Sequence, residues 1–263
     1  MHPILLQLGF IHIYTYGFFV ALGFIVGISV VKKQAGTMGI NTDQIVDLAF
    51  FILIAAILGA RLMYVIINFH FFLNNVGEIV KIWNGGLVFY GGFITALITA
   101  ILYCRIYQLP IGQIADIVAP GLAIGHAFGR IGCFFAGCCY GKTCDLPWAI
   151  TFSHPQSLAP LGVELHPTQL YSVFANACLF GFLIFWRRYK RFHGEIFLIY
   201  MLLYGIIRFA IEFLRGDDRG DIYFHIFSIS QIISLLLSFI SLCALLWVTY
   251  KHQHPKTISL SKP

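Results

Sequence analysis

IVDLAFFILIAAILGARLMYVIIN, residues 45–68, decides the fold, because this stretch is long and apolar enough to cross a lipid bilayer yet carries Arg61 deep inside it. A transmembrane helix needs about 20 mostly apolar residues. An arginine at bilayer depth costs roughly 2.5–3.5 kcal/mol on insertion scales, so it persists where it faces the protein interior and meets a partner. The stretch therefore indicates a helical membrane protein with buried polar contacts.

The whole chain follows the same pattern. Of its 263 residues, 59% are hydrophobic and 11% charged, and the mean hydropathy is +0.83, whereas about a quarter of a soluble domain is charged. We expect an all-α integral membrane protein in which residues 1–263 form one membrane domain of seven transmembrane helices. The spans are expected near residues 13–31, 45–68, 86–104, 111–130, 168–186, 195–214 and 225–249. Because no Lys or Arg precedes the first span, it does not resemble a cleaved secretory signal and is expected to remain.

The Lys and Arg residues predict the orientation, because cytoplasmic loops near span ends carry an excess of them. With the N-terminus outside and the C-terminus cytoplasmic, the outer side holds Lys81, Lys142, Arg215 and Arg219. The cytoplasmic side then holds Lys32, Lys33, Arg105, Arg187, Arg188, Lys190, Arg191, Lys251, Lys256 and Lys262. The net charge of +6 is thus explained by topology and contact with anionic membrane lipid, and no nucleic-acid partner is expected.

One connection between spans is long. Residues 131–167 contain Gly132, Gly137, Gly141 and four prolines, which interrupt helices. We expect an irregular extracytoplasmic cap with a short strand at Trp148 to Phe152. A second outer loop, RGDDRGD at 215–221, concentrates charge.

Two of the spans carry polar residues on one face. Tyr204, Arg208 and Glu212 are spaced i, i+4, so Arg208 can pair with Glu212; the simpler interpretation is an ion pair that only fixes helix packing. In GLAIGHAFGRIG, residues 121–132, His126 shares a face with Arg130. Gly121, Gly125, Gly129 and Gly132 permit close helix packing.

Arg130 is the stronger candidate for an anion site, because it stands directly before what reads as a glycine-rich turn. A guanidinium suits phosphate, and amides freed in such a turn could bind the same oxygens. Asp116 is expected to pack or cap a helix, and Arg61 to pair with a carboxylate or serve a structural role. His166, before the fifth span, is expected to be satisfied by hydrogen bonds.

Cysteines are concentrated in the expected cap. Cys133, Cys138, Cys139 and Cys144 have the spacing C-x4-C-C-x4-C, which matches neither a thioredoxin-like CxxC nor a common zinc pattern. The sequence leaves open a structural disulfide and, as an alternative function, a membrane thiol-disulfide oxidoreductase. No metal and no organic cofactor are expected.

Six ordered blocks together resemble the bacterial prolipoprotein diacylglyceryl transferases. They are Tyr16-Gly17, GARLMYV at 59–65, NGGLVFYGG at 84–92, Asp116 to Gly141 around GRIGCFFAG, HPTQLY at 166–171 and YGIIRFAIEFLRG at 204–216. The resemblance covers nearly the whole chain, and the GRIG-centred block is its most specific part.

The resemblance implies a reaction and its site. A diacylglyceryl group would pass from phosphatidylglycerol to the lipobox cysteine thiol of a preprolipoprotein signal peptide, giving a thioether and glycerol phosphate, in a bacterial inner membrane with the site near the outer leaflet. The simplest oligomeric state is a monomer. The expected catalytic residues are Arg130, Arg208, Tyr90, His126 and Glu212. The lipid would be bound by Tyr16, Gly129, Arg130, Gly141, Tyr204, Arg208 and Arg61.

Three positions depart from the family pattern. Tyr90 stands where many members have histidine, Cys133 where they have asparagine, and Cys138 where they have glutamate. Tyrosine is a weak base at neutral pH, so His126 or solvent is expected to accept the thiol proton while Tyr90 hydrogen-bonds the lipid head. A transporter or lipid-binding protein, or a related transferase with another acceptor, are further alternatives.

Overall fold

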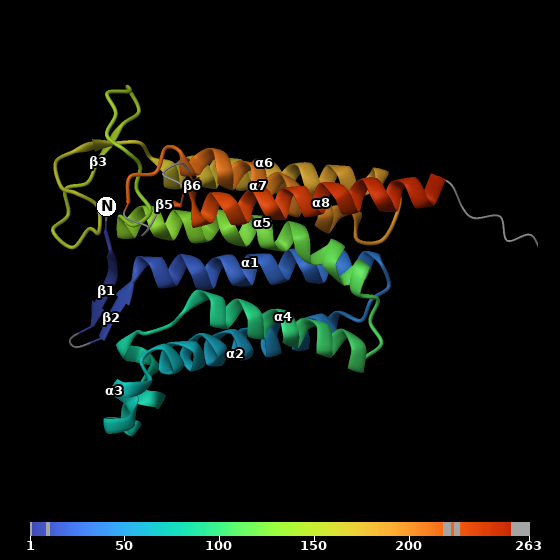
Figure 1. Ribbon diagram of the computed structural model, residues 1–263, viewed down its shortest axis with the longest axis horizontal. Helices are drawn as coiled ribbons and strands as arrows, with labels where there is room; N and C mark the ends of the chain where they lie inside the picture. The colour runs from blue at the N-terminus through green and yellow to red at the C-terminus, as the bar shows by residue number, and fades with distance from the viewer. Residues whose placement is uncertain (1, 9–10, 218–221, 224–226, 254–263) are drawn as a thin grey trace, which may run out of the picture. The chain divides into compact units, whose positions relative to one another are not determined.

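The computed structural model describes residues 2–8, 11–217, 222–223 and 227–253. Its residues form two compact units, one made of residues 1–30 and 115–263 and the other of residues 31–114. Helices dominate both, as the sequence predicts (Figure 1). Three small two-stranded antiparallel sheets, all in the first unit, were not expected apart from a strand near Trp148.

The first unit contains five long helices. They are α1 (Thr15–Thr37), α5 (Ile111–Ala136), α6 (Thr168–Trp186), α7 (Glu195–Glu212) and α8 (Ile229–Gln253); the last residues of α1 and the first four of α5 belong to the second unit. A short 3-10 turn, η3 (Arg187–Tyr189), follows α6. The strands pair as β1 (Ile4–Leu8) with β2 (Ile11–Tyr14), β3 (Ile150–Thr151) with β4 (Glu164–Leu165), and β5 (Ile222–Tyr223) with β6 (Phe227–Ser228).

The second unit is built around two helices that pack along each other. It contains α2 (Thr42–Ile67), α3 (Phe69–Asn74), the 3-10 turns η1 (Val76–Val80) and η2 (Ile82–Asn84), and α4 (Phe89–Ile106). A Cβ on Gly91 would lie 2.4 Å from the Gly59 carbonyl oxygen, so α2 and α4 touch backbone to backbone. Small residues at such crossings are how membrane helices pack closely.

Glycines also bring α1 against α5. A Cβ on Gly23 would lie 2.8 Å from Phe128 Cβ and 3.0 Å from the Gly125 carbonyl oxygen. A Cβ on Gly27 would lie 3.0 Å from the Gly121 oxygen, and one on Gly132 3.1 Å from the Tyr16 oxygen. The expectation of close packing is thus confirmed for Gly121, Gly125 and Gly132.

Within the described part of the chain, six helices are long and apolar enough to cross a membrane: α1, α2, α4, α5, the segment 168–189 that includes α6, and α8. The expected span at 195–214 corresponds to the helix α7, which is not among these six; its 18 residues include Glu195, Arg208 and Glu212. The expected span 225–249 corresponds to α8, although residues 225 and 226 lie outside the described part, as do Arg219, Lys256 and Lys262.

Asp116 ties the start of α7 to α5. Its side chain, 1% exposed, lies 3.0 Å from Lys190 Nζ and accepts hydrogen bonds from the Gly194 amide at 2.8 Å and the Phe197 amide at 3.1 Å. A carboxylate at a helix N-terminus satisfies free amides and complements the helix dipole. The expected capping role of Asp116 is confirmed.

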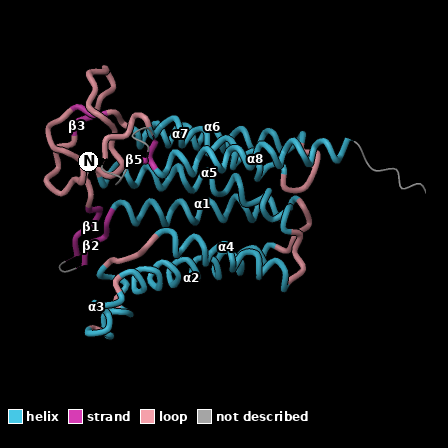
Figure 2. Tube along the Cα trace, in the orientation of Figure 1, coloured by secondary structure: helices cyan, strands magenta, loops and turns pink. Residues whose placement is uncertain are grey.

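The chain between α5 and α6 is irregular, as expected, but it begins later. α5 continues past Arg130 to Ala136, so the irregular segment runs from residue 137 to 167 (Figure 2). It contains the β3–β4 pair and a small core of Phe152, Ala159 and Leu165, the last of which belongs to β4. The segment is fastened to the end of α7 by the hydrogen bonds Lys142 N to Leu214 O at 2.8 Å and Gly216 N to Tyr140 O at 3.1 Å.

Candidate functional site

The polar face of α7 carries a buried ion pair. Arg208 Nη1 lies 2.5 Å from Glu212 Oε2, and the two side chains are 14% and 5% exposed. Ser228 donates its hydroxyl to Glu212 Oε1 at 3.1 Å. The i, i+4 pairing expected from the sequence is confirmed, and the carboxylate fixes the guanidinium near one end of the helix.

Arg215 extends this charged cluster just beyond α7. Its Nε lies 3.8 Å from Glu212 Oε2, and its Nε and Nη2 donate to the two Asp217 carboxylate oxygens at 2.8 and 2.6 Å. Burial alone would lower the pKa of the Arg215 guanidinium, but the hydrogen bonds and charge of Asp217 raise it overall. Two guanidinium groups therefore share one buried glutamate.

A histidine and two tyrosines connect α5 to α7. His126 Nδ1 lies 3.1 Å from the Tyr200 hydroxyl, a hydrogen bond, and its ring centre is 5.0 Å from that of Tyr204. The Tyr200 and Tyr204 rings stack with their centres 5.6 Å apart. Tyr200 was not expected at the site, although its place one turn before Tyr204 puts it on the same helix face.

Arg130 lies one turn beyond His126 on α5. Within the described residues its guanidinium has no hydrogen-bond or ion-pair partner, and the side chain is only partly exposed. Its electrostatic neighbours are the thiols of Cys139 and Cys133, the Tyr204 phenol and the like-charged Arg215. The interpretation of a turn directly after Arg130 is wrong, because residues 131–136 are helical and their amides belong to the helix.

The two glycines expected at the lipid site have opposite surroundings. A Cβ on Gly129 would meet no atom within 4 Å, so the space beside Arg130 on that side is open. A Cβ on Gly141 would lie 2.4 Å from His166 Cβ and 2.5 Å from the His166 carbonyl oxygen. Gly141 thus permits the backbone contact between the irregular segment, His166 and the end of α7. His166 itself hydrogen-bonds the Tyr171 hydroxyl at 3.3 Å, as expected.

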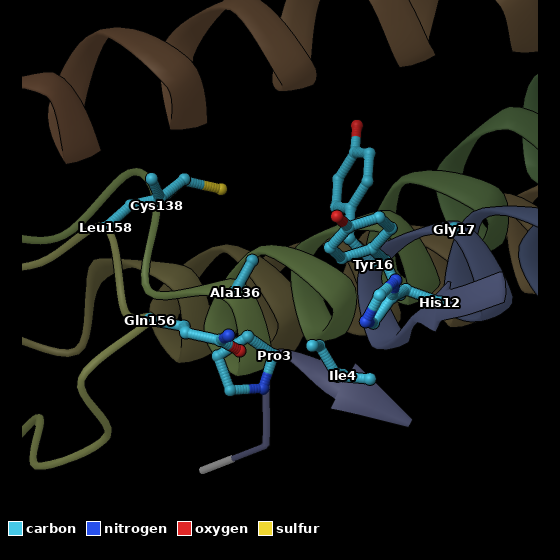
Figure 3. Close-up of a pocket in the computed structure, with 10 residues that line it drawn as sticks. Pro3, Ile4, His12, Tyr16, Gly17, Ala136, Cys138, Gln156 and Leu158 are labelled. Carbon is cyan, nitrogen blue, oxygen red and sulfur yellow. The ribbon is translucent and has the colours of Figure 1, made fainter. Parts of the chain in front are cut away.

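Tyr16 lines a cavity of about 800 Å³ in the first unit (Figure 3). Pro3, His12, Ala136 and Cys138 also contribute to its wall. Tyr16 is 46% exposed, and its hydroxyl interacts electrostatically with Arg130 and with the thiols of Cys133, Cys138 and Cys139. The structure therefore brings Tyr16 and Arg130 into one region.

Three of the four clustered cysteines converge. The Sγ atoms of Cys133, Cys138 and Cys139 all lie within 4.8 Å of one another, and Cys144 is not part of this group. All seven cysteines carry free thiols, so the structure does not contain the disulfide that the sequence left open. Hydrogen bonds from the Cys133 and Cys138 thiols, followed by the charges of Arg215 and Arg130, hold the pKa of the Cys139 thiol well below its ordinary value.

Arg61 and Tyr90 belong to the second unit. Arg61, 7% exposed, donates to four backbone carbonyl oxygens: Glu78 at 2.5 Å, Gly85 at 2.7 Å, Ile79 at 2.9 Å and Gly86 at 3.1 Å. These bonds all go to carbonyls, so the carboxylate partner considered for Arg61 is not among its hydrogen-bond partners in the described residues. Tyr90 lies in the first turn of α4 and is 56% exposed.

The chain matches a family model described as prolipoprotein diacylglyceryl transferase over residues 3–247. The chain belongs to the prolipoprotein diacylglyceryl transferase family. This assignment agrees with the resemblance carried by the six sequence blocks.

Three curated relatives have names consistent with the family. The phosphatidylglycerol--prolipoprotein diacylglyceryl transferase of Clostridium tetani is 39% identical over 235 residues, which cover 89% of this chain and 93% of the relative. The enzyme of the same name from Finegoldia magna is 38% identical over 92% of this chain and 93% of its own. The phosphatidylglycerol--prolipoprotein diacylglyceryl transferase 2 of Clostridium perfringens is 35% identical over 86% and 87%.

Within the first unit of this diacylglyceryl transferase family member, the expected site residues lie on four parts of the chain. Tyr16 comes from α1, the pair His126 and Arg130 from α5, and Tyr204, Arg208 and Glu212 from α7. Gly141 fastens the segment 137–167 beside them. Among these residues, Arg130 and Arg208 are positively charged, and Glu212 is the buried carboxylate that pairs with Arg208.

Proposed function

We propose that this chain transfers the diacylglyceryl group of phosphatidylglycerol to the lipobox cysteine thiol of a preprolipoprotein, forming a thioether and releasing glycerol phosphate. Membership of the family and the names of the relatives support this activity. The observation that carries the site assignment is Arg130, whose guanidinium lacks an acidic partner in the described part of the chain. A partly buried charge requires a counter-charge, and the phosphate of the lipid supplies one.

The arginines stabilise the leaving group. Attack of the thiolate sulfur on the glyceryl carbon breaks the carbon–oxygen bond, and its electrons pass to the phosphate, which gains negative charge. Donors aimed at developing charge in a low-dielectric site lower the barrier. Arg130 and Arg208 take this role, Glu212 orients Arg208, and Tyr16 and Tyr204 donate hydrogen bonds to the lipid head. The open space at Gly129 accommodates the head beside Arg130.

The proton of the acceptor thiol needs a base. His126, hydrogen-bonded to Tyr200 and one turn from Arg130 on α5, takes this role, while Tyr90 is assigned to hydrogen-bonding the lipid head. Measurement of transfer by His126→Ala and Tyr90→Phe proteins tests both roles. We expect each to lose activity, and full activity in both would remove these assignments.

The membrane arrangement is part of the proposal. α7 crosses as a seventh span in one membrane domain, because its charges are neutralised: Glu212 by Arg208 and Glu195, 4% exposed, by Arg191 at 3.8 Å. The N-terminus and the segment 137–167 lie outside, the C-terminus lies in the cytoplasm, and the site opens near the outer leaflet of a bacterial cell membrane. The protein acts as a monomer. For Arg61 we favour the structural role over lipid binding, because carbonyl oxygens already engage its donors.

The direct experiment is to incubate purified protein with phosphatidylglycerol and a lipobox peptide and measure the peptide mass. We expect the peptide to gain a diacylglyceryl group and a serine-substituted peptide to gain nothing. A cysteine peptide that gains no mass, under conditions where a control transferase works, would refute the activity. A folded Arg130→Ala protein with full activity would refute the phosphate role of Arg130.

A further inference from the structure

Three thiols converge next to the proposed phosphate site. Two of them depart from the family pattern: Cys133 stands at an asparagine position and Cys138 at a glutamate position. Cys133 lies in the last turns of α5, and Cys138 and Cys139 follow directly after Gly137. We call these three residues the thiol cluster. Their Sγ atoms all lie within 4.8 Å of one another. Ligands at a Zn–S distance of about 2.3 Å in a tetrahedral site are about 3.8 Å apart, so small side-chain adjustments would place all three around one ion.

The backbone of the thiol cluster is held in place from α6. The Thr168 hydroxyl donates to the Cys139 carbonyl oxygen at 2.7 Å, and the Gln169 amide donates to the Cys138 carbonyl oxygen at 2.8 Å. Both α6 side chains are buried, with 2% and 1% exposed. Cys139 has φ +60°, a left-handed conformation that residues other than glycine seldom adopt. Such a conformation persists where the surroundings over-determine it.

The charges near the thiol cluster suit bound thiolates. Three thiolates around a divalent cation leave one net negative charge. Arg130 and Arg215 both act electrostatically on Cys139 and supply positive charge nearby. Thiolate ligands favour thiophilic cations of the zinc class over magnesium or calcium. The cluster is also reachable, because Cys138 lines the same cavity as Tyr16 (Figure 3).

We propose that Cys133, Cys138 and Cys139 bind a zinc-class cation through three thiolates and that its fourth coordination position receives the thiol of the acceptor cysteine. This inference rests on the proposed transferase function. Catalytic zinc sites characteristically combine three protein ligands with one exchangeable position. A thiol that coordinates such an ion is deprotonated, so the cation supplies the activation that Tyr90, standing at a family histidine position, supplies poorly.

The step balances in atoms and charge. The acceptor thiol gives up its proton to His126 on coordination, and its sulfur then forms the carbon–sulfur bond with the glyceryl carbon. The carbon–oxygen bond to phosphate breaks, and its electron pair leaves with glycerol phosphate, which carries one more negative charge than the phosphate of the lipid did. The thioether is a weak ligand and gives up the fourth position to water. No oxidation or reduction occurs.

Metal content tests the site without depending on activity. Full-length protein is purified in detergent with a reductant and Zn²⁺, freed of loose metal, and analysed for zinc. We expect an equimolar amount of zinc in the unsubstituted protein and loss of zinc in Cys133→Ser, Cys138→Ser and Cys139→Ser. Cys144→Ser is the matched control, since Cys144 lies outside the cluster, and it should keep its zinc. Reduced protein that binds no zinc, or a disulfide between cluster cysteines, would overturn the proposal.

Cobalt replaces zinc to show what occupies the fourth position. Co²⁺ bound by the unsubstituted protein should give sulfur-to-cobalt charge-transfer bands and tetrahedral visible bands. Addition of a lipobox peptide should shift the visible bands, and the same peptide with serine in place of cysteine should not. Because this experiment uses the unsubstituted protein, it does not depend on the folding of a variant. If the visible bands stayed unchanged when the cysteine peptide was added, the proposal that the acceptor thiol coordinates the cation would be overturned.

The transfer assay separates this inference from the proposed function. A free thiol of pKa about 8.5 is only a few per cent ionised at pH 7, so removal of the metal should slow transfer by about 30-fold, with recovery on addition of Zn²⁺. Metal-free protein with undiminished transfer would overturn the zinc role and leave the transferase function intact. Absence of transfer in every form, with the cobalt spectrum of a three-thiolate site present, would refute the transferase function and support the metal site.

Discussion

Arg208 and Glu212 form a close ion pair on one face of α7, with Nη1 and Oε2 2.5 Å apart and both side chains largely buried. The same carboxylate lies 3.8 Å from Arg215. Glu212 therefore lies beside two guanidinium groups. Removing it takes the ion-pair carboxylate away from Arg208, whereas Arg215 keeps its hydrogen bonds to Asp217. A buried charge without its partner is much more costly than the pair itself is favourable.

Glu212→Ala is expected to lower the free energy of unfolding by about 3–5 kcal/mol, the usual effect of breaking a buried pair, and to lower transfer activity because Arg208 loses its orientation. Thermal unfolding in detergent and the peptide mass assay measure the two effects. Arg208→Ala and the double substitution complete a cycle. If the double variant were destabilised by the sum of the single effects, the two side chains would not be energetically coupled and the assigned role of Glu212 would be wrong.

Tyr200→Phe removes the hydrogen bond to His126 while leaving an aromatic ring in the same place. A hydrogen bond of this kind contributes about 1 kcal/mol, so transfer should slow by roughly fivefold if Tyr200 positions His126. Stability should change little. Tyr189→Phe, on the exposed turn η3, is the matched control. Equal transfer rates for Tyr200→Phe and the control would show that Tyr200 does not position the histidine.

Asp116→Ala should destabilise the protein without changing the chemistry of each folded molecule. The substitution frees two partly buried amides at the start of α7 and removes the carboxylate partner of Lys190. An N-terminal cap contributes about 0.5–2 kcal/mol, and the lost ion pair with Lys190 adds to that loss. Asp116→Asn keeps an acceptor oxygen and should recover part of the stability. Unfolding curves and activity per folded protein distinguish this structural role from a catalytic one.

The sequence predicts the local features of this protein well. Long apolar runs predict the six helices of the described residues that are long and apolar enough to cross a membrane, and i, i+4 spacing predicts the Arg208–Glu212 pair. The N-terminal hairpin β1–β2 was missed, because two short apolar strands before α1 are indistinguishable in hydropathy from the start of a span. The prediction ends this span at Arg130, six residues before the end of α5, because Gly132 and Gly137 beyond it are typical of a turn; Gly132 instead packs against Tyr16 of α1.

Long-range contacts account for the rest of the differences. The spacing of Cys133, Cys138 and Cys139 does not predict that their thiols converge. Their backbone is held by hydrogen bonds from Thr168 and Gln169, which belong to another helix. Ser228 is likewise separated from Glu212 by 16 residues and meets it only in the folded chain. The carboxylate partner considered for Arg61 was not found for a related reason. A guanidinium inside a membrane helix suggests a carboxylate partner, yet backbone carbonyls of a distant turn satisfy it equally well.

Substitutions of Arg61, in the second unit, test whether this residue has a structural role or binds lipid. Its guanidinium donates to four carbonyl oxygens, those of Glu78 and Ile79 in η1 and those of Gly85 and Gly86 just after η2. Lysine keeps the charge but cannot present a planar fork of donors. Arg61→Lys should therefore lose much of the stability that Arg61→Ala loses, about 2–4 kcal/mol on the scale of buried charged hydrogen bonds.

The lipid dependence of transfer separates structure from binding in the Arg61→Lys protein. If Arg61 only fastens the turns, the KM for phosphatidylglycerol should stay unchanged in the molecules that remain folded, since lysine could also neutralise a phosphate. Arg105→Lys, on the last turn of α4 and exposed, is the matched control for the exchange of side chains. A large rise in the KM for lipid, with normal unfolding, would assign Arg61 to the lipid site after all.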